Sequence, residues 1–204
     1  MGPDGAIYFA DWFDPRIGAS SHLDESFSGT IYRVAPKGFK PKIPKIDLTN
    51  INGQIMALRS PAINTRYLGF RSLKSRGEKA SNFVFKQLDD ANKWIAARAV
   101  WLLPYMGDQG IDACIKMLEG ENSDQRIVAY RSLHRAGHDM IPHARRMCKD
   151  KSPQVRREIA LSLRDLPAEK TKNIFIELAK RCDTTDKNSL EAIGLGAAKQ
   201  ESII

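Results

Sequence analysis

The segment RIVAYRSLHRAG, residues 126–137, is one copy of a pattern that returns every thirty residues between about Thr65 and Ile193. Its arginine, small residue, leucine and glycine have counterparts at that interval: Arg66, Ala96 and Arg156; Gly69, Ala99, Ile159 and Ser189; Leu73, Leu103, Leu163 and Ile193; Gly77 and Gly107, with Pro167 in the fourth place. A period of 20–50 residues is typical of stacked repeats, because one unit cannot bury its apolar face without its neighbours. The spacing therefore predicts a mainly α-helical solenoid.

Each repeat is expected to fold as a helix pair, because apolar residues recur at i, i+3 or i+4, and i+7. The first helices are predicted at 62–75, 94–106, 125–136, 154–165 and 187–196, and the second helices at 79–89, 110–119, 140–149 and 169–181. This gives about four to five helix pairs, with repeats near 61–90, 91–120, 121–150 and 151–182 and an incomplete one over 183–204.

The first 36 residues differ from the repeats. AIYFADW at 6–12 and GTIYRV at 29–34 favour two strands, joined by the long segment 13–28. Two strands alone are marginal in water. Residues 1–36 are therefore interpreted as the end of a larger β-domain, and the chain as a fragment of a longer protein.

Residues 37–50 are predicted to be a connector. Three prolines and four lysines lie in and beside this stretch, which has little to bury and favours an extended, semi-rigid spacer. Thr49 or Asn50 can cap a short helix over 51–58, which is expected to cover the end of the first repeat within the solenoid domain 51–204.

The charge of +8 is unevenly distributed. Residues 1–50 hold six basic and six acidic side chains; subtracting these from the totals of 32 and 24 leaves 26 and 18 in residues 51–204. A basic solenoid can hold an acidic protein, nucleic acid or a membrane surface, and it can also be a solvated surface without a partner. No apolar run approaches the ~18–20 residues that span a bilayer, and the amino-terminal sequence shows no signal peptide.

The arginines at 66, 126 and 156 resemble the arginine of HEAT repeats, which typically pairs with an aspartate in the preceding turn and forms a ladder along the stack. Asp124 and Asp150 are the expected partners of this structural ladder, and Ala96 interrupts it. A ligand-binding role for the arginines is the alternative, but the repeat fold explains their spacing unaided.

A second basic row, Lys86, Lys116 and Arg146, recurs at thirty residues on the predicted second helices and indicates where an anionic partner could bind. Asp89 and Glu119 dilute its charge, and no stacking aromatic residues are interleaved with it, which disfavours nucleic acid. Cys114, Cys148 and Cys182 have no ligand spacing and are interpreted as small buried side chains without a metal.

GPDGAIYFADW at 2–12, DPRIG at 14–18 and GTIYRV at 29–34 resemble the last blade of a sugar-dehydrogenase-like β-propeller. That blade occurs in membrane-bound-dehydrogenase-type and haem-binding proteins of planctomycete-type bacteria, which continue with HEAT repeats and commonly a c-type cytochrome. ALRSP at 57–61, TRYL at 65–68, RAVWLL at 98–103 and LEAIGLGA at 190–197 match that continuation. The resemblance implies a periplasmic or cell-envelope location and, for the parent protein, a quinone-type cofactor and c-type haem, with none in this fragment.

The expected function is a non-catalytic HEAT-repeat module that binds or spaces proteins, such as propeller and cytochrome modules or an acidic partner. The first alternative makes the parent a periplasmic sugar or alcohol oxidoreductase that passes electrons to a c-type cytochrome, with Asp14, Arg16 and His22 as weak site candidates on the long loop. The second is a basic HEAT protein that binds nucleic acid. The chain has no CxxCH, P-loop, GxGxxG, HExxH or GxSxG motif, so no catalytic residue is assigned.

Overall fold

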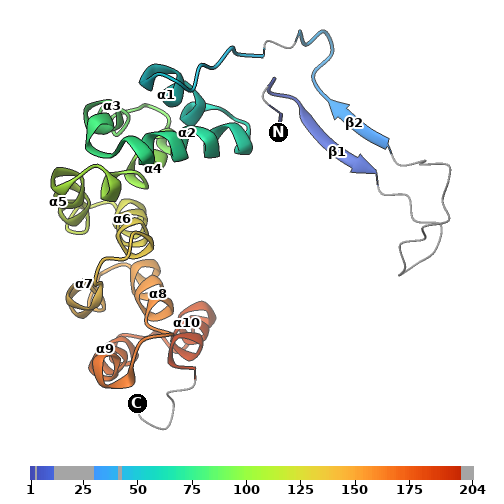
Figure 1. The fold of residues 1–204 in the computed structure, drawn as a ribbon. Helices are drawn as coiled ribbons and strands as arrows, with labels where there is room; N and C mark the ends of the chain where they lie inside the picture. Colours follow the sequence, from blue (N-terminus) through green and yellow to red (C-terminus); the bar gives the residue numbers. More distant parts are fainter. Residues whose placement is uncertain (3, 12–29, 41–42, 199–204) are drawn as a thin grey trace, which may run out of the picture. The chain divides into compact units, whose positions relative to one another are not determined.

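A computed structural model describes residues 1–2, 4–11, 30–40 and 43–198 (Figure 1). The chain divides into two compact units, Met1–Arg76 and Gly77–Ile204, which are described separately. It is mainly helical, with a small antiparallel sheet near the amino terminus, as the repeat pattern predicts.

The first unit begins with an antiparallel hairpin of β1 (Ile7–Asp11) and β2 (Thr30–Val34), in which Phe9 faces Tyr32. Both strands were predicted from their β-branched and aromatic residues. Asp4 lies before β1 and accepts hydrogen bonds from the Ala6 amide, the Tyr8 hydroxyl and Arg33 Nε, the last at 3.1 Å. Desolvation acts to raise the pKa of Asp4, but these hydrogen bonds and the charge of Arg33 outweigh it, so the pKa lies below its ordinary value.

The same unit ends with two packed helices, α1 (Ile51–Arg59) and α2 (Ile63–Arg76). Asn50 caps α1, because its side chain accepts a hydrogen bond from the Gly53 amide at 2.8 Å. Glycine at position 69 allows the two helices to approach closely, since a Cβ atom there would lie 2.5 Å from the Leu58 amide nitrogen. The predicted short helix over 51–58 is therefore present, and it packs against α2.

The second unit is a stack of helices in two layers (Figure 1). One layer holds α4 (Lys93–Val100), α6 (Ser123–Arg135), α8 (Pro153–Ser162) and α10 (Lys187–Ala197). The other holds α3 (Ser81–Phe85), α5 (Asp108–Met117), α7 (Ile141–Met147) and α9 (Ala168–Lys180). This alternation is the predicted solenoid of helix pairs.

The thirty-residue leucines are core residues in both units. Leu73 is buried in the first unit, and Leu103, Leu133 and Leu163 are buried in the second, while Ile193 is half-buried. The repeated glycines Gly77, Gly107 and Gly137 have φ values of 57°, 78° and 90°. Residues other than glycine rarely adopt these positive φ values. The regular spacing of the glycines therefore reflects one turn conformation that recurs after each first helix.

Two predicted helices are wrong in part. The helix expected over 94–106 ends at Val100 and continues as a 3₁₀ turn, η2 (Leu103–Tyr105), because Pro104 lacks the amide hydrogen that the Val100 carbonyl would accept. The helix expected over 79–89 is a 3₁₀ turn, η1 (Gly77–Ala80), followed by the short α3. Its sequence SNFVF consists of weak helix formers, and i to i+3 hydrogen bonds such as Gln87 to Val84 tighten its end.

Candidate interaction surface

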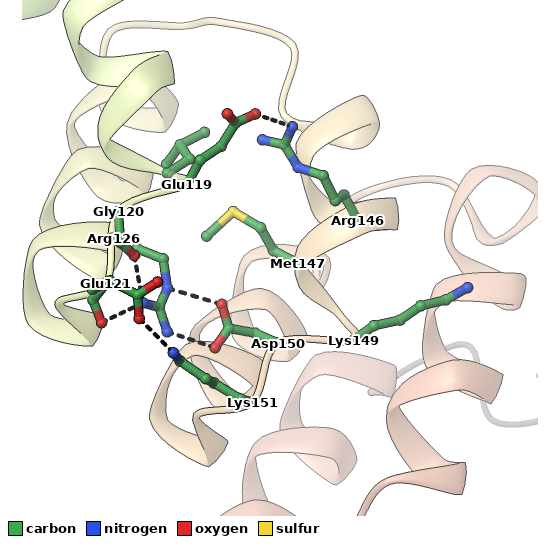
Figure 2. Close-up of a pocket in the computed structure, with 10 residues that line it drawn as sticks. Glu119, Gly120, Glu121, Arg126, Arg146, Met147, Lys149, Asp150 and Lys151 are labelled. Carbon is green, nitrogen blue, oxygen red and sulfur yellow. Dashed lines mark hydrogen bonds and ion pairs between the residues drawn. The ribbon is translucent and has the colours of Figure 1, made fainter.

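A shallow hollow lies in the second unit between the ends of α5 and α7 and the turns that follow them. It has a volume of about 370 Å³ and is lined by Leu118, Glu119, Gly120, Glu121, Arg126, Arg146, Met147, Lys149, Asp150 and Lys151. Figure 2 shows the Met147 thioether between two groups of charged side chains. The hollow contains four residues that the sequence analysis named: Arg146 of the basic row, Glu119 that dilutes its charge, and Arg126 and Asp150 of the arginine ladder.

Arg126 fastens the turn after α5 to the turn after α7. Its Nε and Nη2 atoms donate to the two carboxylate oxygens of Asp150 at 2.9 and 2.7 Å, and its Nη1 donates to the Gly120 and Glu121 carbonyls at 2.7 and 2.9 Å (Figure 2). The arginine side chain is only 4% exposed and the aspartate 11%. Such a two-point pair, in which all three guanidinium nitrogens donate to acceptors within the protein, supports register between repeats and leaves this arginine little capacity to hold a ligand.

Asp150 also begins the next repeat. Its Oδ1 accepts a hydrogen bond from the Ser152 amide at 2.8 Å, at the start of α8. One carboxylate thus joins the arginine of the preceding repeat to the first turn of the following helix. The structure brings Arg126 and Asp150 together, but this aspartate lies in the turn that follows Arg126 in the chain, whereas the sequence analysis expected a partner in the preceding turn.

The other ladder residues take different places. Arg156 donates to the Asp150 and Lys151 carbonyls and to the Arg181 carbonyl, and Arg66 in the first unit donates to the Pro61 carbonyl at 2.8 Å. Asp124 lies exposed in the first turn of α6, with its amide capped by the Asn122 side chain. It forms no ion pair within the described part of the chain, so its expected ladder role is not seen there.

The basic row is only partly available. Arg146 lies 2.6 Å from Glu119 across the mouth of the hollow, and both side chains are at least half exposed. Lys86 and Lys116 are exposed, and among the residues that the structure describes neither forms an ion pair. Two cations of the row therefore face solvent without a partner in the described chain, while the third is neutralised by the acidic residue expected to dilute the row.

Lysines at the rim of the hollow are also paired with acids. Lys151 lies 2.6 Å from Glu121, and Lys149, which points away from the cluster in Figure 2, lies 3.9 Å from Glu177. The hydrogen bond from Lys151, followed by its charge, lowers the pKa of Glu121. Exposed pairs of this kind contribute roughly 0–1 kcal/mol, so a charged partner can displace them at little cost.

Several further sequence predictions concern individual side chains. Asp14, Arg16 and His22 lie outside the described residues. Cys114 and Cys148 are buried, as expected, whereas Cys182 is half-buried. Burial raises the pKa of the Cys114 thiol to about 11. In the described part of the chain, His, Cys, Asp and Glu form no group of three that could hold a metal ion.

The sequence analysis missed an exposed aromatic residue. Trp94, in the first turn of α4, is 65% exposed, and the sequence analysis named it only as the first residue of a predicted helix. The thirty-residue pattern offered a signal, because the equivalent residues Asn64, Asp124 and Gln154 are all polar. A large aromatic side chain at a polar repeat position is therefore a deviation that the repeat fold does not require.

None of the helices in the described ranges is long and apolar enough to cross a bilayer. No curated protein matches the chain. The family model of HEAT repeats matches residues 111–194, from α5 to α10. The match supports the HEAT-repeat resemblance that the arginine spacing implied for this part of the chain.

Proposed function

We propose that this chain is a non-catalytic HEAT-repeat module that binds or spaces protein partners. HEAT repeats typically mediate protein interactions, and the repeat match covers residues 111–194. The observation that carries the proposal is the exposed face of the second-helix layer, where Lys86 and Lys116 repeat at thirty residues. A partner segment with carboxylates at a matching spacing would bind along this layer.

Charge supports an acidic protein as the partner on this face. The net charge of the chain is +8, and the excess lies in residues 51–204. Lys86 and Lys116 form no ion pair within the described residues, and the exposed Arg146–Glu119 pair can open at small cost. Burial and the charge of Arg146 lower the pKa of His143 beside this row, so that side chain stays neutral at pH 7.

The test is a charge-reversal pair with a matched control. Lys86→Glu/Lys116→Glu removes the cations of the row, and Lys170→Glu/Lys172→Glu makes the same charge change on exposed residues of α9. With a 40-residue polyglutamate probe at low salt, calorimetry is expected to show at least a tenfold weaker affinity for the first variant and less than a twofold change for the second. Equal losses in both variants, or no binding by the unaltered chain, would refute a specific site at Lys86 and Lys116.

We also propose that the hairpin belongs to a larger β-sheet, of the propeller type that its sequence resembles. Ile7, Phe9 and Val34 on one face and Ile31 on the other are each at least half exposed. A two-stranded ribbon with apolar side chains exposed on both faces is marginal in water and has free edges for further strands. The sheet would bury these residues and leave the repeats as the adjoining interaction module.

Native-state hydrogen exchange tests the hairpin proposal. Amides of β1 and β2 are expected to exchange rapidly in this chain, because little apolar surface covers them, while amides of α6 and α8 are protected. Equal protection in strands and helices would mean that the hairpin is stable as it is and needs no additional strands.

A further inference from the structure

The outer face of α4 presents aromatic and cationic side chains in one row. Trp94, Arg98 and Trp101 are spaced at i, i+4 and i+7, so they lie on one side of α4 and its carboxyl-terminal cap. Trp94 is exposed, and Trp101 is half-buried two turns further along. We call this row the α4 aromatic face, together with Lys93 from the first turn of α4 and Arg135 from the end of α6.

Cations lie against both indole rings. The Lys93 Nζ atom is 5.1 Å from the centroid of Trp94, and the Arg135 guanidinium carbon is 5.9 Å from that of Trp101. Both distances are within the range of a cation–π interaction. Aromatic residues and arginine are the residue types enriched at the centres of protein interfaces, where they provide most of the binding energy.

The charge of this face is predominantly positive. Lys93, Arg98 and Arg135 contribute three positive charges, and α4 itself carries no acidic residue. The elements that pack most closely against α4 include η2, which has no charged residue, and α6. On α6, Asp124 is the exposed carboxylate, while Arg126 and Arg131 are paired with Asp150 and Glu158. The surplus of cations around an exposed indole complements a partner that carries acids and an apolar anchor.

We propose that the α4 aromatic face docks an acidic segment of a partner protein that inserts a bulky apolar side chain against Trp94. The proposal rests on the interaction function proposed above and assigns a second surface, on the first-helix layer, to the same module. Carboxylates of the segment pair with Lys93 and Arg135, and removal of the Trp94 indole from water contributes the apolar part of the binding free energy.

A protein segment fits this face better than single-stranded nucleic acid. Nucleic-acid strands stack successive bases on the open faces of several aromatic rings along a basic groove. Here Trp94 is the exposed indole, a cation lies over each ring, and Trp101 is half-buried. One accessible ring can anchor a side chain but does not provide a track for several bases.

The experiment selects binders from a displayed library of random 12-residue peptides, using the full chain as bait and Trp94→Ala as the counter-selection bait. Trp94 is exposed, so this variant should retain the circular dichroism spectrum and thermal transition of the unaltered chain. The recovered peptides are expected to be rich in aspartate and glutamate around at least one large apolar residue. Trp94→Ala should weaken them at least tenfold, and Lys93→Glu/Arg135→Glu should do the same.

Three outcomes would overturn the proposal. The first is recovery of no peptide that depends on Trp94, and the second is recovery of peptides without an acidic bias. The third is binding of a 15-residue deoxythymidine oligonucleotide that Trp94→Ala abolishes, since this would assign the face to nucleic acid. If Lys86→Glu/Lys116→Glu abolishes peptide binding and Trp94→Ala does not, the peptides bind on the second-helix layer. That result would agree with the proposed function but would contradict a binding role for the α4 aromatic face.

Discussion

Two joints, that is, interfaces between successive first helices, can be compared: one between α6 and α8 and one between α4 and α6. They occupy equivalent places in the stack, but different contacts stabilise them. In the α6–α8 joint, Arg126 forms a two-point ion pair with Asp150, and the Tyr130 hydroxyl lies 2.8 Å from the Ser162 hydroxyl. In the α4–α6 joint, the residues thirty positions earlier are Ala96 and Gly120, so the ion pair has no counterpart. Both members of the ion pair are therefore absent from this joint.

The α4–α6 joint is held instead by small residues and apolar packing. Cys114 is buried 3.5 Å from the Ser132 hydroxyl, and its thiol lies 3.9 Å from the Val100 carbonyl that Pro104 leaves without its helical donor. At position 110, a Cβ atom would lie 2.1 Å from the Leu103 carbonyl, so glycine permits this close approach. The thirty-residue period therefore sets the stacking of the leucines, whereas the hydrogen bonds and ion pairs between repeats differ from joint to joint.

Removal of the arginine should have the largest effect. Arg126→Ala leaves the largely buried Asp150 carboxylate without its charge partner, although the Ser152 amide still donates to it. We expect a loss of about 2 kcal/mol in the free energy of unfolding, somewhat below the 3–5 kcal/mol typical of a fully buried pair. Urea denaturation followed by circular dichroism measures it.

The matched control is Arg156→Ala, the equivalent arginine one repeat later, which donates to backbone carbonyls and has no aspartate partner in the described chain. Its loss should be about 1 kcal/mol. A double-mutant cycle with Asp150→Ala should give a coupling energy of about 1 kcal/mol or more. Equal losses in Arg126→Ala and Arg156→Ala would show that the ion pair adds nothing to the α6–α8 joint.

Alkaline pH should weaken the same joint through Tyr130. Burial raises the pKa of this phenol to about 12, against the hydrogen bond with Ser162, which acts to lower it. The folded state therefore favours the neutral phenol. Its stabilising contribution is fully present below pH 10 and is lost as the pH rises from 10 to 12, with a slope of at most about 1.4 kcal/mol per pH unit.

Denaturation curves measured between pH 9 and 12 test this effect, with Tyr130→Phe as the control, because phenylalanine has no proton to lose. The stability of the variant should fall less steeply over that interval. The absorbance of tyrosinate near 295 nm should show one phenol ionising later than the others in the unaltered chain. Parallel stability profiles for the two proteins would contradict the assignment.

Much of the fold could be predicted because the residues that repeat at thirty positions are the buried ones and those in the turns. Leu103, Leu133 and Leu163 recur for packing, and glycine at 107 and 137 recurs for a positive φ, so the spacing identifies both core and turns. The breaks in helix geometry were harder to predict. Pro104 lies inside a run with helical periodicity, and the loss of one amide donor outweighs that periodicity.

The interaction surfaces were less accessible to sequence reasoning, because pairing across repeats is a property of three-dimensional distance. The sequence analysis placed Arg146 in a basic row and noted Glu119 as a diluting charge, but only coordinates show the two in contact at 2.6 Å. Trp94 was only the first residue of a predicted amphipathic helix, and the sequence analysis did not assign it to a face. A comparison with the polar equivalents at 64, 124 and 154 would have identified it as a surface residue.

Introducing the missing arginine–aspartate ion pair should stabilise the α4–α6 joint modestly. Ala96→Arg/Gly120→Asp reproduces the pair of the α6–α8 joint, and a Cβ atom at 120 would lie 3.3 Å from the Met117 carbonyl, so a side chain needs only a small adjustment. We expect a gain of about 0.5–1 kcal/mol, because position 96 is half-buried and solvent screens the pair. Ala96→Arg alone should give no gain in urea denaturation. A loss in the double variant would mean that this joint has no room for the pair.

The smallest effect is expected at the rim of the α6–α8 joint, where Lys151 and Glu121 are both largely exposed. The hydrogen bond and charge of the lysine lower the pKa of Glu121, so the ionised carboxylate is favoured in the folded state. This contribution is present above the pKa of an unfolded glutamate and is lost as the pH falls through the folded value. Titration of the Glu121 carboxyl carbon by NMR should give a midpoint below that of a free glutamate, and Lys151→Met should raise it. Added salt should raise it as well, since the pair is open to solvent. If Lys151→Met left the titration midpoint of Glu121 unchanged, the two side chains would not interact in solution. The polar contacts that stabilise this joint would then be confined to its buried arginine, aspartate and tyrosine.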